Sequence, residues 1–176
     1  MKIYSTKFKG LKIIKLKKFN DFRGDIVKIF NKENNKINFK FSESYISISK
    51  KGTIRGLHGQ MGKYSQSKII FCIQGKFLDI AIDLRKSSTT YKKIFKRIVH
   101  SKNSTILVIP EGFAHGIISL EDQTILINFN SKKYKPNKEF GININSLNLK
   151  LPKIKFHHTK KDKKLPKLNE FLKENK

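Results

Sequence analysis

The sequence predicts an all-β fold of the jelly-roll type, and two observations support this prediction. Short apolar runs fill the 176 residues, and turn signals separate these runs at intervals of about 8–12 residues, a spacing typical of antiparallel sandwiches and barrels. Within individual runs, such as 77–83 and the residues around Tyr45, apolar and polar side chains alternate as in strands with one buried face. No internal repeat or linker interrupts this pattern, so we expect residues 1–176 to form one domain.

The turns and strands can be placed in order along the chain. Glycine, asparagine and proline mark the turns because they favour tight-turn backbone conformations, as at Gly24, Gly52, Gly75, Asn103 and Pro110. The runs between the turns predict strands at residues 11–16, 26–30, 45–49, 68–73, 77–83, 94–99, 104–109, 116–119 and 124–129. Residues 53–57 have a strand-like pattern as well, so His58 is expected at the end of one strand and His115 at the start of the strand at 116–119. Only residues 166–176 have a helical pattern, which predicts a short C-terminal helix on a β-barrel.

The formal net charge of +26 raises the possibility of nucleic-acid binding. Only four of the cationic residues are arginines, and the lysines are scattered along the chain instead of forming a stripe. Proteins that read a specific sequence usually use arginine forks for bases and phosphates. Lysine, asparagine, isoleucine and phenylalanine are all abundant, a bias that AT-rich codons produce by themselves. We therefore expect no specific nucleic-acid partner.

Membrane insertion and secretion are not expected either. The chain has no run of about 18 apolar residues, and no apolar segment of a signal peptide follows Met1. The single cysteine, Cys72, lies in the apolar run 69–73 and is expected to be a small buried hydrophobe. These features predict a cytoplasmic protein.

Two segments carry residues suited to chemistry. The first is Gly52 to Gln60, in which Arg55 and His58 lie three residues apart around a glycine, and the second is Pro110-Glu-Gly-Phe-Ala-His115. A guanidinium binds anions, and an imidazole with an unperturbed pKa of about 6.5 can transfer protons at neutral pH. Inward-facing residues of a jelly roll converge on one cavity, so the two segments predict an enzyme site. Taken singly, each histidine could instead be a barrel or turn residue with its hydrogen bonds satisfied.

A series of short motifs spans nearly the whole chain in order: Asp21-Phe-Arg-Gly24, Ser47-Ile-Ser-Lys-Lys-Gly52, Arg55-Gly-Leu-His58 with Gln60, Gln66-Ser-Lys68, Asp83-Leu-Arg85 with Ser88 and Thr90, Ile109-Pro-Glu-Gly-Phe-Ala-His-Gly116, Tyr134-Lys-Pro136 with Glu139 and Gly141, and Thr159-Lys-Lys-Asp162. Together these segments resemble the nucleotide-sugar 3,5-epimerases, the family of dTDP-4-dehydrorhamnose 3,5-epimerase. The segment ending at His115 also looks like the second motif of cupins. The resemblance therefore implies a cupin-type jelly-roll barrel.

The resemblance also implies an activity, the epimerisation of a nucleoside-diphosphate 4-keto-6-deoxysugar in the synthesis of deoxysugar and surface-polysaccharide precursors. The ketone acidifies the neighbouring C–H bonds, so the reaction needs a base, a cation beside the enolate oxygen and a returned proton, but no redox cofactor. By resemblance His58 is the base, Asp162 orients it, and Lys68 is the cation beside the enolate oxygen. Without that context Lys68 could be a surface lysine and Asp162 a solvated charge in a lysine-rich tail.

Eight further residues are expected to contact the substrate or brace the pocket, again by resemblance: Arg23, Arg55, Gln60, Asp83, His115, Asn128, Tyr134 and Lys161. No metal is expected, because metal-binding cupins have a second histidine two residues after the first, where this chain has Gln60. Family members are homodimers that exchange an N-terminal strand, so Arg23 is expected to serve the partner's site.

The chain also departs from the family pattern. Asn128 occupies the place of the tyrosine that acts as general acid, and a carboxamide cannot donate a proton as an acid. Water, Tyr64 or Tyr134 could replace it, or only one carbon could be inverted; we favour inversion at C3 alone. Glu43 and Tyr45 replace a Gln and an Asn associated with base recognition, which leaves the nucleotide open. The competing functions are a nucleotide-sugar 3,4-ketoisomerase and a non-catalytic sugar-nucleotide binding module.

Overall fold

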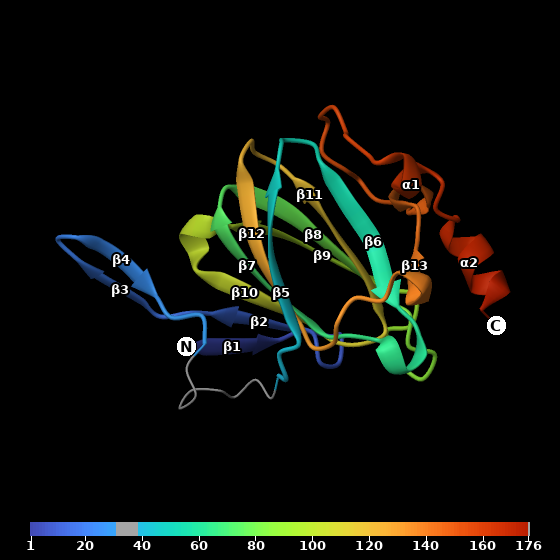
Figure 1. The fold of residues 1–176 in the computed structure, drawn as a ribbon, viewed down its shortest axis with the longest axis horizontal. Helices are drawn as coiled ribbons and strands as arrows, with labels where there is room; N and C mark the ends of the chain where they lie inside the picture. Colours follow the sequence, from blue (N-terminus) through green and yellow to red (C-terminus); the bar gives the residue numbers. More distant parts are fainter. Residues whose placement is uncertain (31–38, 176) are drawn as a thin grey trace.

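Two antiparallel β-sheets form the body of the protein in the computed structural model, which describes residues 1–30 and 39–175 (Figure 1). One sheet has six strands in the order β1-β2-β10-β7-β12-β5. Their bounds are β1 (Lys2–Ser5), β2 (Lys12–Lys15), β5 (Glu43–Ser49), β7 (Lys68–Gln74), β10 (Thr105–Ile109) and β12 (Thr124–Asn130). The other has five strands in the order β13-β6-β11-β8-β9. Its strands are β6 (Ile54–Gln60), β8 (Lys76–Asp83), β9 (Ile94–His100), β11 (Phe113–Ser119) and β13 (Glu139–Gly141).

The main core lies between the two sheets. Ile70, Cys72 and Leu107 of the six-stranded sheet pack against Phe77 and Phe113 of the five-stranded sheet, and all five are buried. Burial raises the pKa of the Cys72 thiol to about 12, which keeps it protonated and makes it a hydrophobic core residue, as predicted. The sheets therefore form the all-β jelly-roll barrel that the sequence predicts.

The C-terminal segment covers the outer face of the five-stranded sheet. Ile142, Leu147 and Phe171 pack against Ile54 and Ile80 in a second apolar cluster. This segment contains α1 (Lys160–Lys163) and α2 (Leu168–Glu174), which lie beside β6 and β13 in Figure 1. The predicted C-terminal helix is thus confirmed as α2, and α1 holds Asp162 against the barrel. None of the helices in the described ranges is long and apolar enough to cross a membrane.

A separate hairpin of β3 (Lys18–Asp21) and β4 (Gly24–Val27) projects from the body on the side away from α2 (Figure 1). Its apolar side chains face solvent in the single chain: Phe22 is 98% exposed and Ile26 is 58% exposed. The hairpin therefore presents apolar groups that nothing else in the described chain covers.

The strand predictions were right in position but incomplete. Each predicted segment overlaps a strand, although the segment expected at 26–30 is β4, which ends at Val27. Strands β1, β3 and β13 were missed. His58 and His115 were expected at a strand end and a strand start, but both lie inside strands, because β6 continues to Gln60 and β11 begins at Phe113.

Candidate active site

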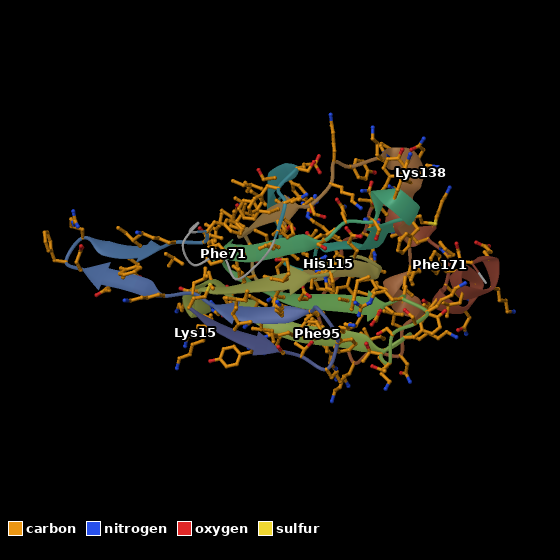
Figure 2. The ribbon with its side chains drawn as sticks, turned by 90° about the horizontal axis from the view of Figure 1, so that it is seen from below. Lys15, Phe71, Phe95, His115, Lys138 and Phe171 are labelled. Carbon is orange, nitrogen blue, oxygen red and sulfur yellow. The ribbon has the colours of Figure 1, made fainter. Side chains whose placement is uncertain are left out.

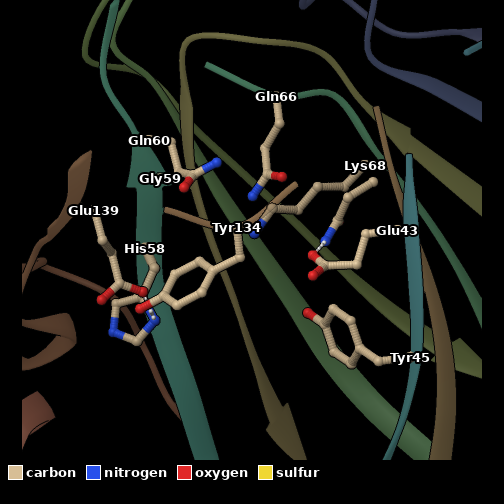
Figure 3. A pocket seen from close by; sticks show the side chains of 10 residues that line it. Glu43, Tyr45, His58, Gly59, Gln60, Gln66, Lys68, Tyr134 and Glu139 are labelled. Atoms are coloured by element: carbon tan, nitrogen blue, oxygen red, sulfur yellow. Dashed lines mark hydrogen bonds and ion pairs between the residues drawn. The ribbon is translucent and has the colours of Figure 1, made fainter. Parts of the chain in front are cut away.

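A cavity of about 380 Å³ opens between the two sheets at one end of the barrel. Strands β5, β6, β7, β12 and β13 all have an end there, because neighbouring strands run antiparallel. The residues that line the cavity are Glu43, Tyr45, His58, Gly59, Gln60, Gln66, Lys68, Asn130, Tyr134 and Glu139. Polar side chains from both sheets thus converge on one space (Figure 3).

His58 stands between two carboxylates on the β6 wall. Its Nε2 lies 2.8 Å from Asp162 Oδ1, and its Nδ1 lies 3.6 Å from Glu139 Oε1. Asp162 is only 6% exposed, and the Thr159 hydroxyl caps its backbone N–H at the start of α1. When Asp162 accepts the Nε2 proton, the unprotonated nitrogen of the neutral ring is Nδ1, which can accept a proton from a ligand. The two carboxylates then stabilise the imidazolium that forms.

Lys68 begins β7 and extends into the cavity from the opposite sheet (Figure 3). Burial lowers the pKa of its ammonium, and the charges of Glu139, Asp79 and Glu43 partly oppose that shift. A cation in such a site interacts strongly with an anionic ligand, because little water competes. The cavity therefore places an imidazole on one wall and an ammonium on the other, two groups chemically suited to act as a base and as an electrophile.

Glu43, Tyr45 and Asn130 form the rest of the Lys68 side of the cavity. Asn130 Nδ2 donates a hydrogen bond to Glu43 Oε2 at 3.2 Å. Asn130 Oδ1 and Gln66 Oε1 are buried and have no hydrogen-bond partner within the described residues. Such acceptors suit a polar ligand, because a buried oxygen without a partner is costly. Glu43 and Tyr45 replace a Gln and an Asn that the family resemblance links to base recognition, and the structure places both beside Lys68 in the cavity.

His115 lies deeper, in a second histidine–carboxylate pair. His115 is the cross-strand neighbour of His58 in the β6–β11 pairing, and Figure 2 shows it in the interior of the molecule. Its Nε2 lies 2.7 Å from Asp79 Oδ2, and the two residues are 7% and 0% exposed. Gly56 permits the close approach of β6 to β11, since a Cβ there would lie 2.6 Å from the His115 carbonyl oxygen. Asp79 was missed, although a carboxylate inside the apolar run 77–82 was a usable signal.

A second depression, of about 730 Å³, adjoins the cavity, and Tyr45 and His58 line both. Its other charged and titratable residues are Arg55, His157, His158, Lys161 and Asp162. Arg55 is held in place by hydrogen bonds from Nε to the Ser49 hydroxyl at 3.0 Å and from Nη2 to the Ile48 carbonyl at 3.1 Å. The two cations, Arg55 and Lys161, make this depression suited to a phosphate-containing ligand.

The remaining predicted site residues have different surroundings. Gln60 and Tyr134 line the cavity, and Gln60 also binds the loop before η4 (Pro136–Lys138), since its Oε1 accepts from Lys135 N at 2.6 Å. The Lys161 ammonium contacts Glu139. Asn128 is buried on the inward face of β12, two residues before Asn130, and is not among the residues that line the cavity. Glu139 was present in a recognised motif but was given no role.

Two predicted residues lie outside the cavity. Asp83 is fully buried at the end of β8, where its carboxylate accepts hydrogen bonds from Arg85, Ser88 and Thr90 of the following turn. It therefore braces this turn and cannot contact a ligand in the cavity. Arg23 lies on the projecting hairpin, 72% exposed, and pairs with Asp21 at 2.7 Å. Within residues 1–30 and 39–175, no group of three or more His, Cys, Asp or Glu side chains is placed to hold a metal ion.

Comparison with known proteins agrees with this geometry. The family model described as dTDP-4-dehydrorhamnose 3,5-epimerase matches residues 5–170. The dTDP-4-dehydrorhamnose 3,5-epimerase of Shigella flexneri is 34% identical over 160 residues, which cover 86% of this chain and 87% of that protein. The crystal structure of the Bacillus anthracis enzyme, with TDP and PPi bound, has a TM-score of 0.89 at 33% identity and covers 95% of this chain and 99% of its own. An epimerase from Legionella pneumophila, in complex with dTDP-4-keto-L-rhamnose, has a TM-score of 0.88 at 29% identity and covers 96% of this chain and 93% of its own.

Proposed function

Because the chain belongs to the dTDP-4-dehydrorhamnose 3,5-epimerase family, we propose that it epimerises a nucleoside-diphosphate 4-keto-6-deoxysugar. The observation that carries this proposal is the pair of His58 and Asp162, 2.8 Å apart, facing Lys68 across one cavity. The chemistry is that of an isomerase acting through an enolate, in the synthesis of deoxysugar precursors.

The proposed reaction begins with proton transfer from carbon to His58. His58 Nδ1 takes the proton beside the ketone, and Asp162 stabilises the resulting imidazolium. The electrons of the C–H bond move into an enolate whose oxygen lies beside Lys68, where the ammonium stabilises the new negative charge. Return of a proton to the other face of the carbon restores the ketone with inverted configuration.

The two depressions suggest how the substrate is held. The sugar occupies the cavity, where Gln66 and Asn130 offer free carbonyl oxygens to its hydroxyl groups. The diphosphate lies in the adjoining depression near Arg55 and Lys161. The ligand named for the Legionella relative, a dTDP-sugar, has this division into sugar and diphosphate, and the TDP named for the Bacillus relative contains the diphosphate part.

We propose inversion at C3 alone as the outcome. Asn128 stands where the family resemblance places the acid for a second inversion, and its carboxamide has no acidic proton at neutral pH. We also propose a homodimer in which Arg23 reaches the partner's diphosphate. Its position on a projecting hairpin with exposed apolar residues supports this arrangement.

The test is proton NMR of dTDP-4-keto-6-deoxyglucose in deuterium oxide with the wild-type protein and with His58→Ala. We expect deuterium to enter C3, an epimer to accumulate, and both signals to vanish in His58→Ala. Exchange at C5 as well would contradict inversion at C3 alone. If no member of a panel of 4-keto sugar nucleotides exchanges a proton, the epimerase proposal fails and a binding module becomes the better hypothesis.

A further inference from the structure

We infer that Tyr45 is the residue that returns the proton to the enolate, on the face opposite His58. This inference rests on the proposed function and identifies the proton donor for the single inversion at C3, since Asn128 has no acidic proton to give. The nearest structural neighbour of Asn128 on the adjoining strand carries the missing phenol.

The strand register places Tyr45 next to Asn128. In the β5–β12 pairing, Asn128 is directly opposite Tyr45, and the next inward pair is Asn130 opposite Glu43. Residues directly opposite in an antiparallel pair share one face, with Cβ atoms about 4.5–5.5 Å apart. Asn128 and Asn130 are buried on the inward face of β12, so Tyr45 and Glu43 are on the inward face of β5. The Tyr45 phenol therefore lies on the strand next to the position where the family resemblance places the tyrosine, on the same face of the same sheet.

Tyr45 and His58 belong to facing walls of the cavity. Tyr45 comes from the six-stranded sheet and His58 from the five-stranded sheet, and both line the same 380 Å³ space. Figure 3 shows the Tyr45 hydroxyl pointing into the cavity on the side of Glu43, with His58 and Glu139 across from it. A flat enolate held between these walls would present one face to the imidazole and the other to the phenol.

The surroundings of Tyr45 keep its proton in place until it is needed. Burial raises the pKa of the phenol, Glu43 raises it further, and Arg55 opposes the shift. The residue is nevertheless 45% exposed, so water can restore the proton after each turnover. The hydroxyl is thus a protonated donor at neutral pH with a route to solvent.

The other tyrosines are less well placed. Tyr134 lines the cavity, but its hydroxyl lies near Glu139 and Lys161, on the wall that carries His58 (Figure 3). A donor on the side of the base would return the proton to the face from which it came. Tyr64 is not among the residues that line the cavity.

The proton inventory balances over one turnover. His58 gains a proton as the C–H bond breaks, and the electrons of that bond form the enolate. The Tyr45 O–H bond then breaks, a C–H bond forms on the other face, and the enolate electrons restore the ketone. The tyrosinate takes a proton from water, and His58 gives one to water, so no other reactant is consumed.

The experiment separates proton abstraction from inversion. Tyr45→Phe is compared with wild type in deuterium oxide on dTDP-4-keto-6-deoxyglucose, and deuterium entry at C3 and epimer formation are followed by NMR. A general acid contributes typically about 10²- to 10⁴-fold. We expect Tyr45→Phe to slow epimer formation by that factor while deuterium still enters C3 with retained configuration, because His58 can return a deuteron to the face it serves. Tyr91→Phe, a tyrosine outside the cavity, is the matched control and should behave as wild type.

A second variant tests the register argument. Adding Asn128→Tyr to Tyr45→Phe should restore inversion, because it places a phenol at the cross-strand position. An active wild type whose epimer formation is unchanged in Tyr45→Phe would overturn the inference and leave the proposed function intact. Three further outcomes would also overturn it. Folded Tyr45→Phe could lose deuterium exchange and inversion to the same extent, or Tyr134→Phe could lose inversion instead. The folded double variant could also fail to restore inversion. If wild type exchanges no proton on any 4-keto sugar nucleotide, the proposed function fails and this inference fails with it.

Discussion

At the scale of single residues, the proposed role of Asp162 is to set which nitrogen of His58 acts as the base. Its carboxylate accepts from Nε2 at 2.8 Å, which leaves Nδ1 without a proton in the neutral ring. In Asp162→Asn the amide group can instead donate to Nε2, which moves the ring proton to Nδ1 and blocks the base. We expect epimer formation to fall by about 10³- to 10⁴-fold, the size of loss seen when a histidine base is held in the wrong tautomer.

The control for this prediction is Asp162→Ala, which removes the acceptor without offering a donor. It should be less impaired than Asp162→Asn, since Nδ1 can still lose its proton. Nucleotide affinity, measured by calorimetry with dTDP, should change little in either variant. Equal losses in both variants would show that Asp162 acts only through its charge.

The residues that could be predicted from the sequence are those with a recognisable local context. His58, Lys68 and Asp162 were identified through motifs, and the structure brings His58 and Asp162 together although they are 104 residues apart. Glu139 and Asp79 were not assigned because their roles depend on cross-strand and loop contacts. Asp83 was assigned to the pocket wrongly, since only the structure shows that its own turn satisfies its carboxylate.

At the scale of elements, the turn between β8 and β9 depends on Asp83. Burial by itself raises the pKa of Asp83, but hydrogen bonds from Arg85, Ser88 and Thr90 outweigh burial and hold the pKa at about 2. A carboxyl whose pKa is lower in the folded than in the unfolded protein stabilises the fold at pH values above its unfolded-state pKa. This contribution disappears as the pH falls toward its folded-state pKa. Asp83→Asn should therefore lower the free energy of unfolding at pH 7 by about 1–2 kcal/mol.

Urea unfolding of wild type and Asp83→Asn at several pH values checks this prediction. The difference between the two proteins should be full above pH 4 and should shrink as the pH falls toward 2. Asp122→Asn provides a comparison, because Asp122 accepts a backbone hydrogen bond from Lys51 at an exposed turn and is expected to contribute less. A difference that does not depend on pH would mean that the ionised form of Asp83 is not what matters.

Strand prediction succeeded where apolar residues dominate and failed for short strands of three or four residues with few buried positions. β7, β8 and β10 are buried on most positions and were found nearly to their ends. β1 and β3 are short, largely exposed and contain lysine, so their hydrophobic pattern is weak, and their strand form depends on pairing with β2 and β4. The end of β6 was placed too early because it also depends on pairing: hydrogen bonding to β11 and β13 extends β6 through His58 to Gln60.

At the scale of the whole molecule, the proposed homodimer would link the projecting hairpin to catalysis. Phe22 and Ile26 are exposed in the single chain, and Arg23 lies between them, away from its own cavity. If Arg23 serves the partner's site, then Arg23→Ala and His58→Ala each inactivate every site of their own homodimers. In a mixed dimer the site with an intact His58 receives an intact Arg23 from the other subunit, and the second site lacks both.

Subunit mixing therefore tests the exchange directly. Equal amounts of Arg23→Ala and His58→Ala, dissociated and reassembled together, give about half mixed dimers, so about a quarter of the wild-type activity should return. Each variant taken through the same cycle alone should stay inactive. If Arg23 instead acts within its own subunit, every subunit in the mixture lacks either Arg23 or His58, and no complete site can form. The absence of recovery in a verified mixed dimer would therefore place Arg23 in its own chain's site. Recovery would instead explain why a polar arginine is carried on an apolar hairpin at a distance from the cavity: the apolar residues join the subunits, and that contact delivers the guanidinium to the diphosphate.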